Sequence, residues 1–326
     1  MSAFFRFSGR VLALVLACLV SIIGPVLIMM THSSHTEIVS HTTFPKQKYS
    51  YDEPARDPDD GVVYRGAQTR VMYNRVGKCG SRATLTLLEA VAGRNNFTLV
   101  LSDIHNQREL SLPEQIDLVN YINQLPPPFL YSRHMFYIDF QRLGAGPLVH
   151  INVIRDPLSR FISSYYYRRF GDGREHNSNF QGDKEQTIDE CMERNHHECS
   201  SPKRMFYVIP FFCGQEEACR EPSSWALEKA KANVRDKYLV VGILEEYEDT
   251  LRVLEKLLPI YFKGIVDILR NPDPETKMRL ETMSTKHKTP PNEHNTRLLR
   301  FRMQTEYEFY YFVRDRFHQL KHQLGI

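Results

Sequence analysis

The sequence has too little of several features to fit whole classes of protein. Its six cysteines are too few for a small fold built on disulfides. With 42% hydrophobic and 25% charged residues, it is not a mainly disordered, collagenous or polytopic membrane chain. A net charge of only +3 gives no overall argument for a nucleic acid or other polyanionic partner. There is no internal repeat, and 326 residues allow one large domain or two small ones.

One long apolar run stands near the amino terminus. Residues 11–30 contain no charged side chain, and twenty helical residues span roughly 30 Å, the thickness of a bilayer core. Arg6 and Arg10 precede the run without an acid, which predicts a cytoplasmic tail at 1–10 and translocation of the rest. We expect an uncleaved signal anchor at 11–30. A cleaved signal peptide, whose apolar core is usually about 7–15 residues, is the alternative.

The composition changes twice after the apolar run. Residues 31–68 are polar, with Pro, Ser, Thr and Asp and no sustained apolar periodicity, which is typical of a stem. From residue 69 onward, apolar runs and amphipathic stretches alternate. The remaining segment, 69–326, has about 258 residues and is long enough for one substantial core.

The alternation within 69–326 predicts an α/β fold with a mainly parallel sheet. Apolar runs predict strands at 69–76, 97–103, 128–136, 148–156 and 238–246. Amphipathic spacing predicts helices at 82–93, 113–124, 157–170, 247–258 and 293–322, the last as one long helix.

Four of the cysteines form two closely spaced pairs in loop-like sequence. Cys191 and Cys199 make one pair, and Cys213 and Cys219 make the other. Neither pair has the short C-x-x-C spacing of a typical zinc site. We therefore predict two local disulfides formed in an oxidising lumen.

Other readings of this region stay open. His196 and His197 lie between the first two cysteines, so a mixed Cys/His metal site is the alternative to a disulfide. Cys18 lies in the apolar run and Cys79 is left over. Asn96 begins an Asn-Phe-Thr glycosylation acceptor, which is consistent with a lumenal location.

A glycine-containing turn joins the first predicted strand to the first predicted helix, in the stretch YNRVGKCGSR (73–82). A helix amino terminus offers N–H groups and positive dipole to an anion, and Lys78 adds a charge. The stretch lacks the G-x-x-x-x-G-K-[ST] pattern of nucleoside triphosphatases, which counts against a nucleotide-dependent kinase. A plain turn with an exposed lysine is the simpler reading.

A second strand-to-helix junction lies at 154–163, in IRDPLSRFIS. Ligands of open α/β sheets bind at the carboxyl ends of strands. Arg155 and the hydroxyl of Ser163 are suited to hold a phosphate. On the simpler reading, Asp156 caps the helix and Arg160 is solvated.

Together these stretches resemble a known family. YNRVGKCGSR, SRHMFYIDF, HINVIRDPLSRFISSYYYRRFGD, IPFFCGQEEACREP and VGILEEYED, in this order, are similar to the uronyl 2-O-sulfotransferases, from about Val71 to the carboxyl end. The family includes chondroitin/dermatan, heparan sulfate and insect pipe-type enzymes. The resemblance implies a P-loop-like sulfotransferase fold and the donor 3′-phosphoadenosine 5′-phosphosulfate, with no metal.

The resemblance also implies roles for two residues. His134 matches the catalytic base, and imidazole titrates near neutral pH. Lys78 matches the lysine that contacts the 5′-phosphosulfate and stabilises charge on the leaving phosphate. Heparan-type members carry a second histidine where this chain has Ser132, so any role of that histidine is not carried over. Heparan-type loops also read P-K-T-A-S-T, unlike this chain.

Further matches concern donor binding. The residues that match the 5′-phosphosulfate loop are Lys78, Cys79, Gly80, Ser81 and Arg82, and Arg75, just before this loop, is a further candidate for donor binding. Arg155 and Ser163 match the 3′-phosphate contacts. Lys286, His287 and Lys288 resemble, more loosely, a loop that covers the donor.

An acceptor rich in carboxylates and sulfates needs local positive charge. The candidates for acceptor contact are Arg75, Arg133, Arg168, Arg169, Arg174, His105 and the tyrosines Tyr165, Tyr166 and Tyr167. Adjacent arginines on a helix point about 100° apart, so Arg168 and Arg169 need not share a target. A solvated charged face, with the tyrosines in the core, is the alternative.

These expectations combine into one function. The chain is expected to be a Golgi, single-pass type II enzyme that sulfates the 2-OH of uronic acid in a glycosaminoglycan such as dermatan or chondroitin sulfate. Heparan sulfate or another glycan as acceptor, and a non-catalytic glycan-binding protein, are the alternatives. A homo-oligomer is compatible with the sequence.

Overall fold

The computed structural model describes residues 69–104, 107–172 and 180–326. The predicted tail (1–10), anchor (11–30) and stem (31–68) lie outside these ranges. Within them, no helix combines the length and the apolar character needed to cross a membrane.

Five parallel strands form the sheet, in the order β2-β3-β1-β4-β5. Their bounds are β1 Arg70–Tyr73, β2 Thr98–Leu101, β3 Phe129–Ser132, β4 Val149–Ile154 and β5 Tyr238–Ile243. All residues of β3 and β4 are buried, which explains their nearly continuous apolar sequence. The predicted α/β class with a mainly parallel sheet is confirmed.

Helices connect and surround the strands. The longer ones are α2 Ser81–Ala92, α3 Leu112–Gln124, α4 Pro157–Phe170, α9 Ser224–Lys237, α10 Tyr247–Leu257, α13 Pro274–Glu281, α14 Glu293–Arg302 and α15 Gln304–Leu324. The short ones are η1 Gln141–Leu143, α5 Ile188–Glu193, α6 His197–Ser200, α7 Pro202–Met205, α8 Ile209–Cys213, η2 Glu217–Arg220, η3 Leu244–Glu246, α11 Pro259–Phe262 and α12 Ile265–Arg270.

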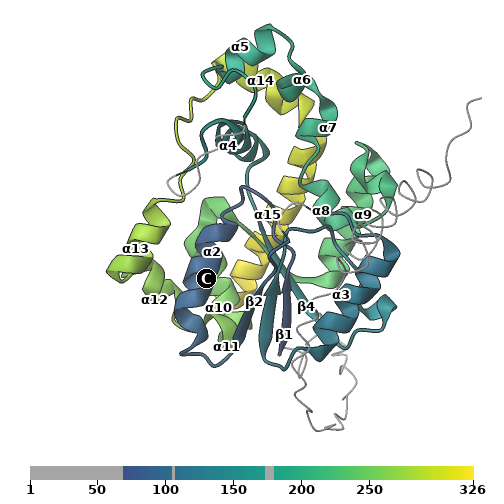
Figure 1. Ribbon diagram of the computed structural model, residues 1–326, viewed down its shortest axis with the longest axis vertical. Helices are drawn as coiled ribbons and strands as arrows, with labels where there is room; N and C mark the ends of the chain where they lie inside the picture. The colour runs from purple at the N-terminus through teal and green to yellow at the C-terminus, as the bar shows by residue number, and fades with distance from the viewer. Residues whose placement is uncertain (1–68, 105–106, 173–179) are drawn as a thin grey trace, which may run out of the picture. The chain divides into compact units, whose positions relative to one another are not determined.

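The helices cover both faces of the sheet and one end of it. Figure 1 shows α2 and α10 on one side, and α3, α8 and α9 on the other. Helices α4, α5, α6 and α14 gather beyond the end from which β4 runs into α4. Strands β1 and β4 are neighbours in the sheet. The chain continues from β1 to β2 toward one edge of the sheet and from β4 to β5 toward the other edge. Such a switch point is where open α/β sheets bind ligands, and both predicted loops follow these two strands.

All five strands end two to four residues before their predicted ends, and the last helix is divided. Strand β3 stops at Ser132, not at 136, although Met135 and Phe136 stay buried; the Arg133 N–H still reaches the Tyr73 carbonyl at 3.3 Å. The single helix expected over 293–322 is wrong, because it is broken at Met303, whose φ is −100° and ψ is 18°. Met303 is itself buried, so the apolar pattern continues across the break.

Both predicted disulfides are confirmed: Cys191 pairs with Cys199, and Cys213 with Cys219. The segments around them are not loops, however. They contain the short helices α5, α6, α8 and η2, and all four sulfur-bearing residues are buried. Each disulfide therefore crosslinks short neighbouring helices, and its cysteines pack within the hydrophobic core.

One buried histidine makes the fold sensitive to acid. The ring of His150 in β4 lies 5.2 Å from that of Tyr137 and 5.4 Å from that of Tyr238. Its Nε2 has no hydrogen-bond partner among the described residues. Burial lowers the pKa of His150 to about 4, because a charged imidazolium would lose its hydration.

A His150→Phe variant is therefore expected to resist acid better than the wild type. The unfolded chain binds a proton at this position near pH 6.5 and the folded chain only near pH 4. The free energy of unfolding therefore decreases as the pH falls from 6.5 to 4. Between pH 7 and pH 5 the loss is about 2 kcal/mol, which the variant avoids. Urea unfolding at both pH values measures this, and equal losses in the two proteins would contradict it.

Candidate functional site

The loop between β1 and α2, residues 74–80, is called the donor loop below because the family resemblance predicts that it binds the sulfate donor. It turns through two left-handed residues. Lys78 has φ 67° and Gly80 has φ 79°, and α2 begins directly afterwards. No side chain caps this helix and no acid lies in its first turn. Its first N–H groups therefore keep their capacity to bind an anion, which fits the predicted phosphosulfate cradle.

The cationic side chains of this loop gather around one ring. The Lys78 Nζ lies 3.6 Å and the Arg82 guanidinium 5.5 Å from the centroid of Tyr167, on α4. Arg82 also pairs with the fully buried carboxylate of Asp172. Tyr167 thus supports the donor loop, rather than standing on an open surface for a sugar.

The loop is also fixed from behind. Arg155 donates to the Lys78 carbonyl at 3.5 Å. The Cys79 thiol is fully buried, and burial raises its pKa to about 12, so it stays protonated near neutral pH. Cys79 can offer its backbone N–H to a ligand, but not a thiolate.

The second junction and the carboxyl-terminal loop lie together. The Ser163 hydroxyl, buried in α4, is 3.2 Å from that of Thr285. The Lys286 N–H donates to the Gly171 carbonyl at 3.4 Å, and Lys286 and Lys288 are exposed. Asp156 accepts from the Ser159 N–H at 2.8 Å, so the predicted helix cap is present as well. The cap and a phosphate-binding role of Arg155 and Ser163 are therefore compatible.

His134 follows the end of β3 and faces the donor loop. Its Nδ1 lies 2.9 Å from the Arg75 carbonyl, which can only accept, so the ring nitrogen donates. In the neutral ring this fixes the proton on Nδ1 and the basic lone pair on Nε2. A histidine in this tautomer is suited to accept a proton from a substrate.

A buried amide network holds the backbone under His134. The Asn152 amide donates to the Asn74 carbonyl at 2.7 Å and to the Asn74 side chain at 3.1 Å. The Tyr238 hydroxyl donates to the same side chain at 2.9 Å. Asn74 itself donates to the Phe211 carbonyl at 3.0 Å, which ties β1, β4, β5 and α8 together beneath the site.

Three arginines around the donor loop and His134 are buried without an ion pair to any described residue. Arg75 is 6% exposed, Arg133 4% and Arg160 2%, and each has one N–H with no partner in the described part of the chain. Burial lowers the pKa of Arg75 and of Arg160. The Glu306 carboxylate partly balances the charge of Arg160. No described acid pairs with Arg75 or Arg133, and buried cations are rarely left uncompensated, so these two are suited to receive an anion.

Arg160 is a residue that the sequence did not single out. The simpler reading of the junction, in which Arg160 is solvated, is wrong for this residue: it is buried, and its guanidinium lies 4.0 Å from the ring centroid of Tyr207. Tyr207 contacts the donor loop in turn, since a Cβ on Gly77 would lie only 2.7 Å from the Tyr207 hydroxyl. No local sequence pattern joins two residues 47 positions apart.

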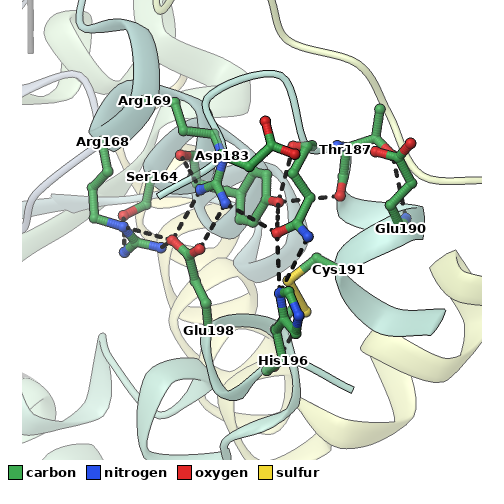
Figure 2. A network of polar contacts seen from close by, with 12 residues as sticks. Ser164, Arg168, Arg169, Asp183, Thr187, Glu190, Cys191, His196 and Glu198 are labelled. Carbon is green, nitrogen blue, oxygen red and sulfur yellow. Dashed lines mark hydrogen bonds and ion pairs between the residues drawn. A yellow bond between two sulfur atoms is a disulfide. The ribbon is translucent and has the colours of Figure 1, made fainter. Parts of the chain in front are cut away.

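Arg168 and Arg169 do share a target. Figure 2 shows both guanidiniums converging on the Glu198 carboxylate, at 2.6 Å and 2.8 Å. Burial opposes ionisation of Glu198, but the bonds and charges of the two arginines outweigh it and lower the pKa of this carboxyl. Long side chains bridge the 100° between adjacent helix positions.

The residues around the cluster of Arg168, Arg169 and Glu198 pack in the core. Tyr165 is fully buried beneath the Arg169 guanidinium, 3.6 Å from it, and donates to the Gln186 carbonyl at 3.0 Å. The structure therefore places Tyr165 and Arg169 in the core, while Arg168 lies partly exposed at its edge. His105 and Arg174 lie outside the described residues. Asn96 is exposed at the turn before β2.

No group of three or more His, Cys, Asp and Glu that could hold a metal occurs within 69–104, 107–172 and 180–326. The chemistry of the site, as far as the described residues show it, comes from one imidazole, one lysine, several guanidiniums and helix N–H groups. Such a set of cations and N–H groups is suited to bind anionic groups.

Comparison with known proteins agrees with this chemistry. The model of the sulfotransferase family matches residues 64–313. Uronyl 2-sulfotransferase of Mus musculus is 46% identical over 265 residues, which cover 79% of this chain and 64% of that protein. Heparan sulfate 2-O-sulfotransferase 1 of Cricetulus griseus is 33% identical over 281 residues, covering 83% and 76%. The chain thus spans about 64% of the length of the uronyl relatives.

A solved structure is more distant. Retinol dehydratase, crystallised with androsterone and the inactive cofactor PAP, is 13% identical, covers 73% of this chain and 80% of its own, and has a TM-score of 0.36. So remote a likeness carries no argument about the site. The family model and the two groups of relatives, by contrast, show the family. The chain belongs to the sulfotransferase family, alongside the uronyl 2-sulfotransferases and the heparan sulfate 2-O-sulfotransferases.

Proposed function

We propose that this protein transfers a sulfuryl group from 3′-phosphoadenosine 5′-phosphosulfate to the 2-OH of a uronic acid in a glycosaminoglycan. The names of its relatives support the reaction and the position. The observation that carries the proposal is the placement of His134, with its Nδ1 on the Arg75 carbonyl, beside the loop of Lys78.

The donor fits the residues present. When bound, it supplies a sulfuryl group whose sulfur bonds to the sugar oxygen as its bond to the phosphate oxygen breaks. The uncapped amino terminus of α2 and Lys78 would hold its phosphosulfate. Arg155 and Ser163, the latter with Thr285 beside it, would hold its 3′-phosphate. Arg75 and Arg160 each keep one buried N–H without a partner among the described residues, and these N–H groups add donors for an anion near the loop.

The chain's own residues divide the chemistry between them. His134 takes the proton of the attacking hydroxyl at Nε2, and its Nδ1–H keeps the ring oriented through the Arg75 carbonyl. Lys78 stabilises the negative charge that develops where the phosphate leaves. Arg133, which precedes His134 in the chain, is buried and bonded to Gln107 at 3.3 Å, and it would add a further cation near the base.

The relatives named for uronyl substrates are more similar than those named for heparan sulfate, at 46% against 33% identity. We therefore favour a dermatan or chondroitin type of acceptor. The decisive experiment incubates the purified full chain with labelled donor and desulfated dermatan, chondroitin and heparan chains. Transfer to at least one chain is expected; folded protein that binds glycan but neither the donor nor its desulfated product would overturn the proposal in favour of a glycan-binding protein.

The location is part of the same proposal: a Golgi type II membrane enzyme with the catalytic part in the lumen. Two buried disulfides support an oxidising compartment, and exposed Asn96 supports contact with the glycosylation machinery. Protease added to intact microsomes is expected to leave 69–326 whole until detergent is present. Cleavage without detergent would place the domain on the cytoplasmic side.

A further inference from the structure

Arg108 lies beside the proposed base, although nothing in the sequence singled it out. Its carbonyl accepts the Phe136 N–H at 3.0 Å, two residues after His134. Its neighbour Gln107 accepts from the Arg133 guanidinium. The Arg108 side chain itself is exposed. The segment that carries Arg108 is therefore fixed against the His134 loop while its guanidinium faces solvent.

Tyr207 forms a platform under this guanidinium. The Arg108 guanidinium lies 4.8 Å from the Tyr207 ring centroid, and that of Arg160 lies 4.0 Å from it. The Tyr207 N–H is held at 3.0 Å by the buried carboxylate of Glu306, and its hydroxyl lies against Gly77 of the donor loop. Tyr207 thus contacts both Gly77 of the donor loop and Arg108, whose backbone is bonded to the segment just after His134.

The charge of Arg108 is not neutralised within the described part of the chain, where it forms no ion pair. The acid next to it, Glu109, pairs with Arg220 at 2.8 Å. Stacking on an aromatic ring uses the plane of a guanidinium and leaves its N–H edges to bind a carboxylate or sulfate bidentately. An exposed, stacked and positioned arginine is well suited to recognise a planar or tetrahedral oxyanion.

We propose that Arg108, stacked on Tyr207, determines acceptor specificity by binding an anionic group of the glycan, on a sugar next to the one that reacts. The group is a carboxylate or a sulfate ester, which offer the same oxygen acceptors. The inference rests on the proposed function for the identity of the acceptor. It adds a recognition site outside the donor loops, on a segment that no motif covers.

An Arg108→Gln variant tests the proposal through acceptor affinity. Loss of one bidentate charged contact is expected to raise KM for the acceptor about 10–30-fold. The affinity for adenosine 3′,5′-bisphosphate is expected to stay unchanged. The matched control is Arg314→Gln on α15, because Arg314 also lies 4.8 Å from a tyrosine centroid, that of Tyr311, but carries an ion pair with Asp315. This control is expected to behave as the wild type.

Modified acceptors identify the group that is bound. If the group is a carboxylate, carboxyl-reduced chains are expected to have a higher KM than unmodified chains with the wild type, and the same KM as unmodified chains with Arg108→Gln. If the group is a sulfate, desulfated chains are expected to show this pattern instead. Unchanged KM in Arg108→Gln on every acceptor would overturn the proposal, and so would an equal loss of donor-product affinity. Direct binding of acceptor oligosaccharides separates the two proposals: weaker binding in the variant with no turnover by the wild type would sink the proposed function but not the binding site.

Discussion

Replacing His134 with alanine is expected to lower kcat for sulfate transfer by about 10²–10⁴-fold, the usual contribution of a positioned general base. A sugar hydroxyl that keeps its proton attacks poorly, so the rate depends on its removal. The hydrogen bond from Nδ1 to the Arg75 carbonyl, at 2.9 Å, puts the basic lone pair on Nε2. Initial rates with labelled donor, at saturating donor and acceptor, measure the effect.

Two controls show whether the loss belongs to chemistry. His294 is an exposed histidine in α14, and His294→Ala is expected to keep the wild-type rate. His134→Ala is expected to bind adenosine 3′,5′-bisphosphate within about twofold of the wild type, since the loss concerns a step after binding. Full activity of His134→Ala would remove this residue from the reaction.

The second large effect is expected at Lys78. A Lys78→Met variant keeps an unbranched apolar stem beside Tyr167 and removes the charge that lies 3.6 Å from that ring. The expected fall in kcat is about 10²–10³-fold, the usual cost of losing one group that stabilises developing negative charge. Affinity for the desulfated product is expected to fall less, because the N–H groups at the start of α2 remain.

Lys277→Met is a suitable comparison. Lys277 is exposed on α13, so its loss removes one positive charge without touching the donor loop. Steady-state rates and product affinity of both variants, measured at the same ionic strength, separate local from overall charge. Equal and small effects of the two substitutions would show that Lys78 serves solubility rather than catalysis.

The strands and both loops could be predicted because their signals are local. Strand β4 is buried on both faces, so four of its six residues are apolar and the apolar run ends at Ile154; only His150 and Asn152 interrupt it. The glycines of the β1–α2 loop mark a turn: Gly80 has φ 79°, a conformation that favours glycine, and a Cβ there would lie 2.5 Å from the Leu244 side chain. A strand followed by such a turn and a helix can be recognised from about twenty residues of sequence.

Other features could not be predicted because their partners are distant. The burial of Arg160 depends on Tyr207, and the shared target of Arg168 and Arg169 is Glu198, about thirty positions away. The break of the last helix at Met303 has no proline or glycine to announce it, since the apolar spacing continues through it. In each case tertiary packing, not local propensity, decides the outcome.

Arg108 shows the same limit for function. Its backbone is joined to the His134 loop through Phe136, and its side chain to the donor loop through Tyr207 and Gly77. Only the fold brings these segments together. The residue types at 107–109 resemble any solvated charged stretch. Arg108 and Arg314 lie at the same distance from a tyrosine ring, and what separates them is the bond of Arg108 to the His134 loop and the ion pair of Arg314 with Asp315.

Position-resolved analysis of the product tests the proposed reaction most directly. Desulfated dermatan and chondroitin chains are incubated with the purified full chain and labelled donor, then cleaved into disaccharides and separated. A uronyl 2-O-sulfotransferase places the label on O2 of the uronic acid, and the His134→Ala protein places little there. Label confined to the amino sugar, or the same label from both proteins, would contradict the proposed function.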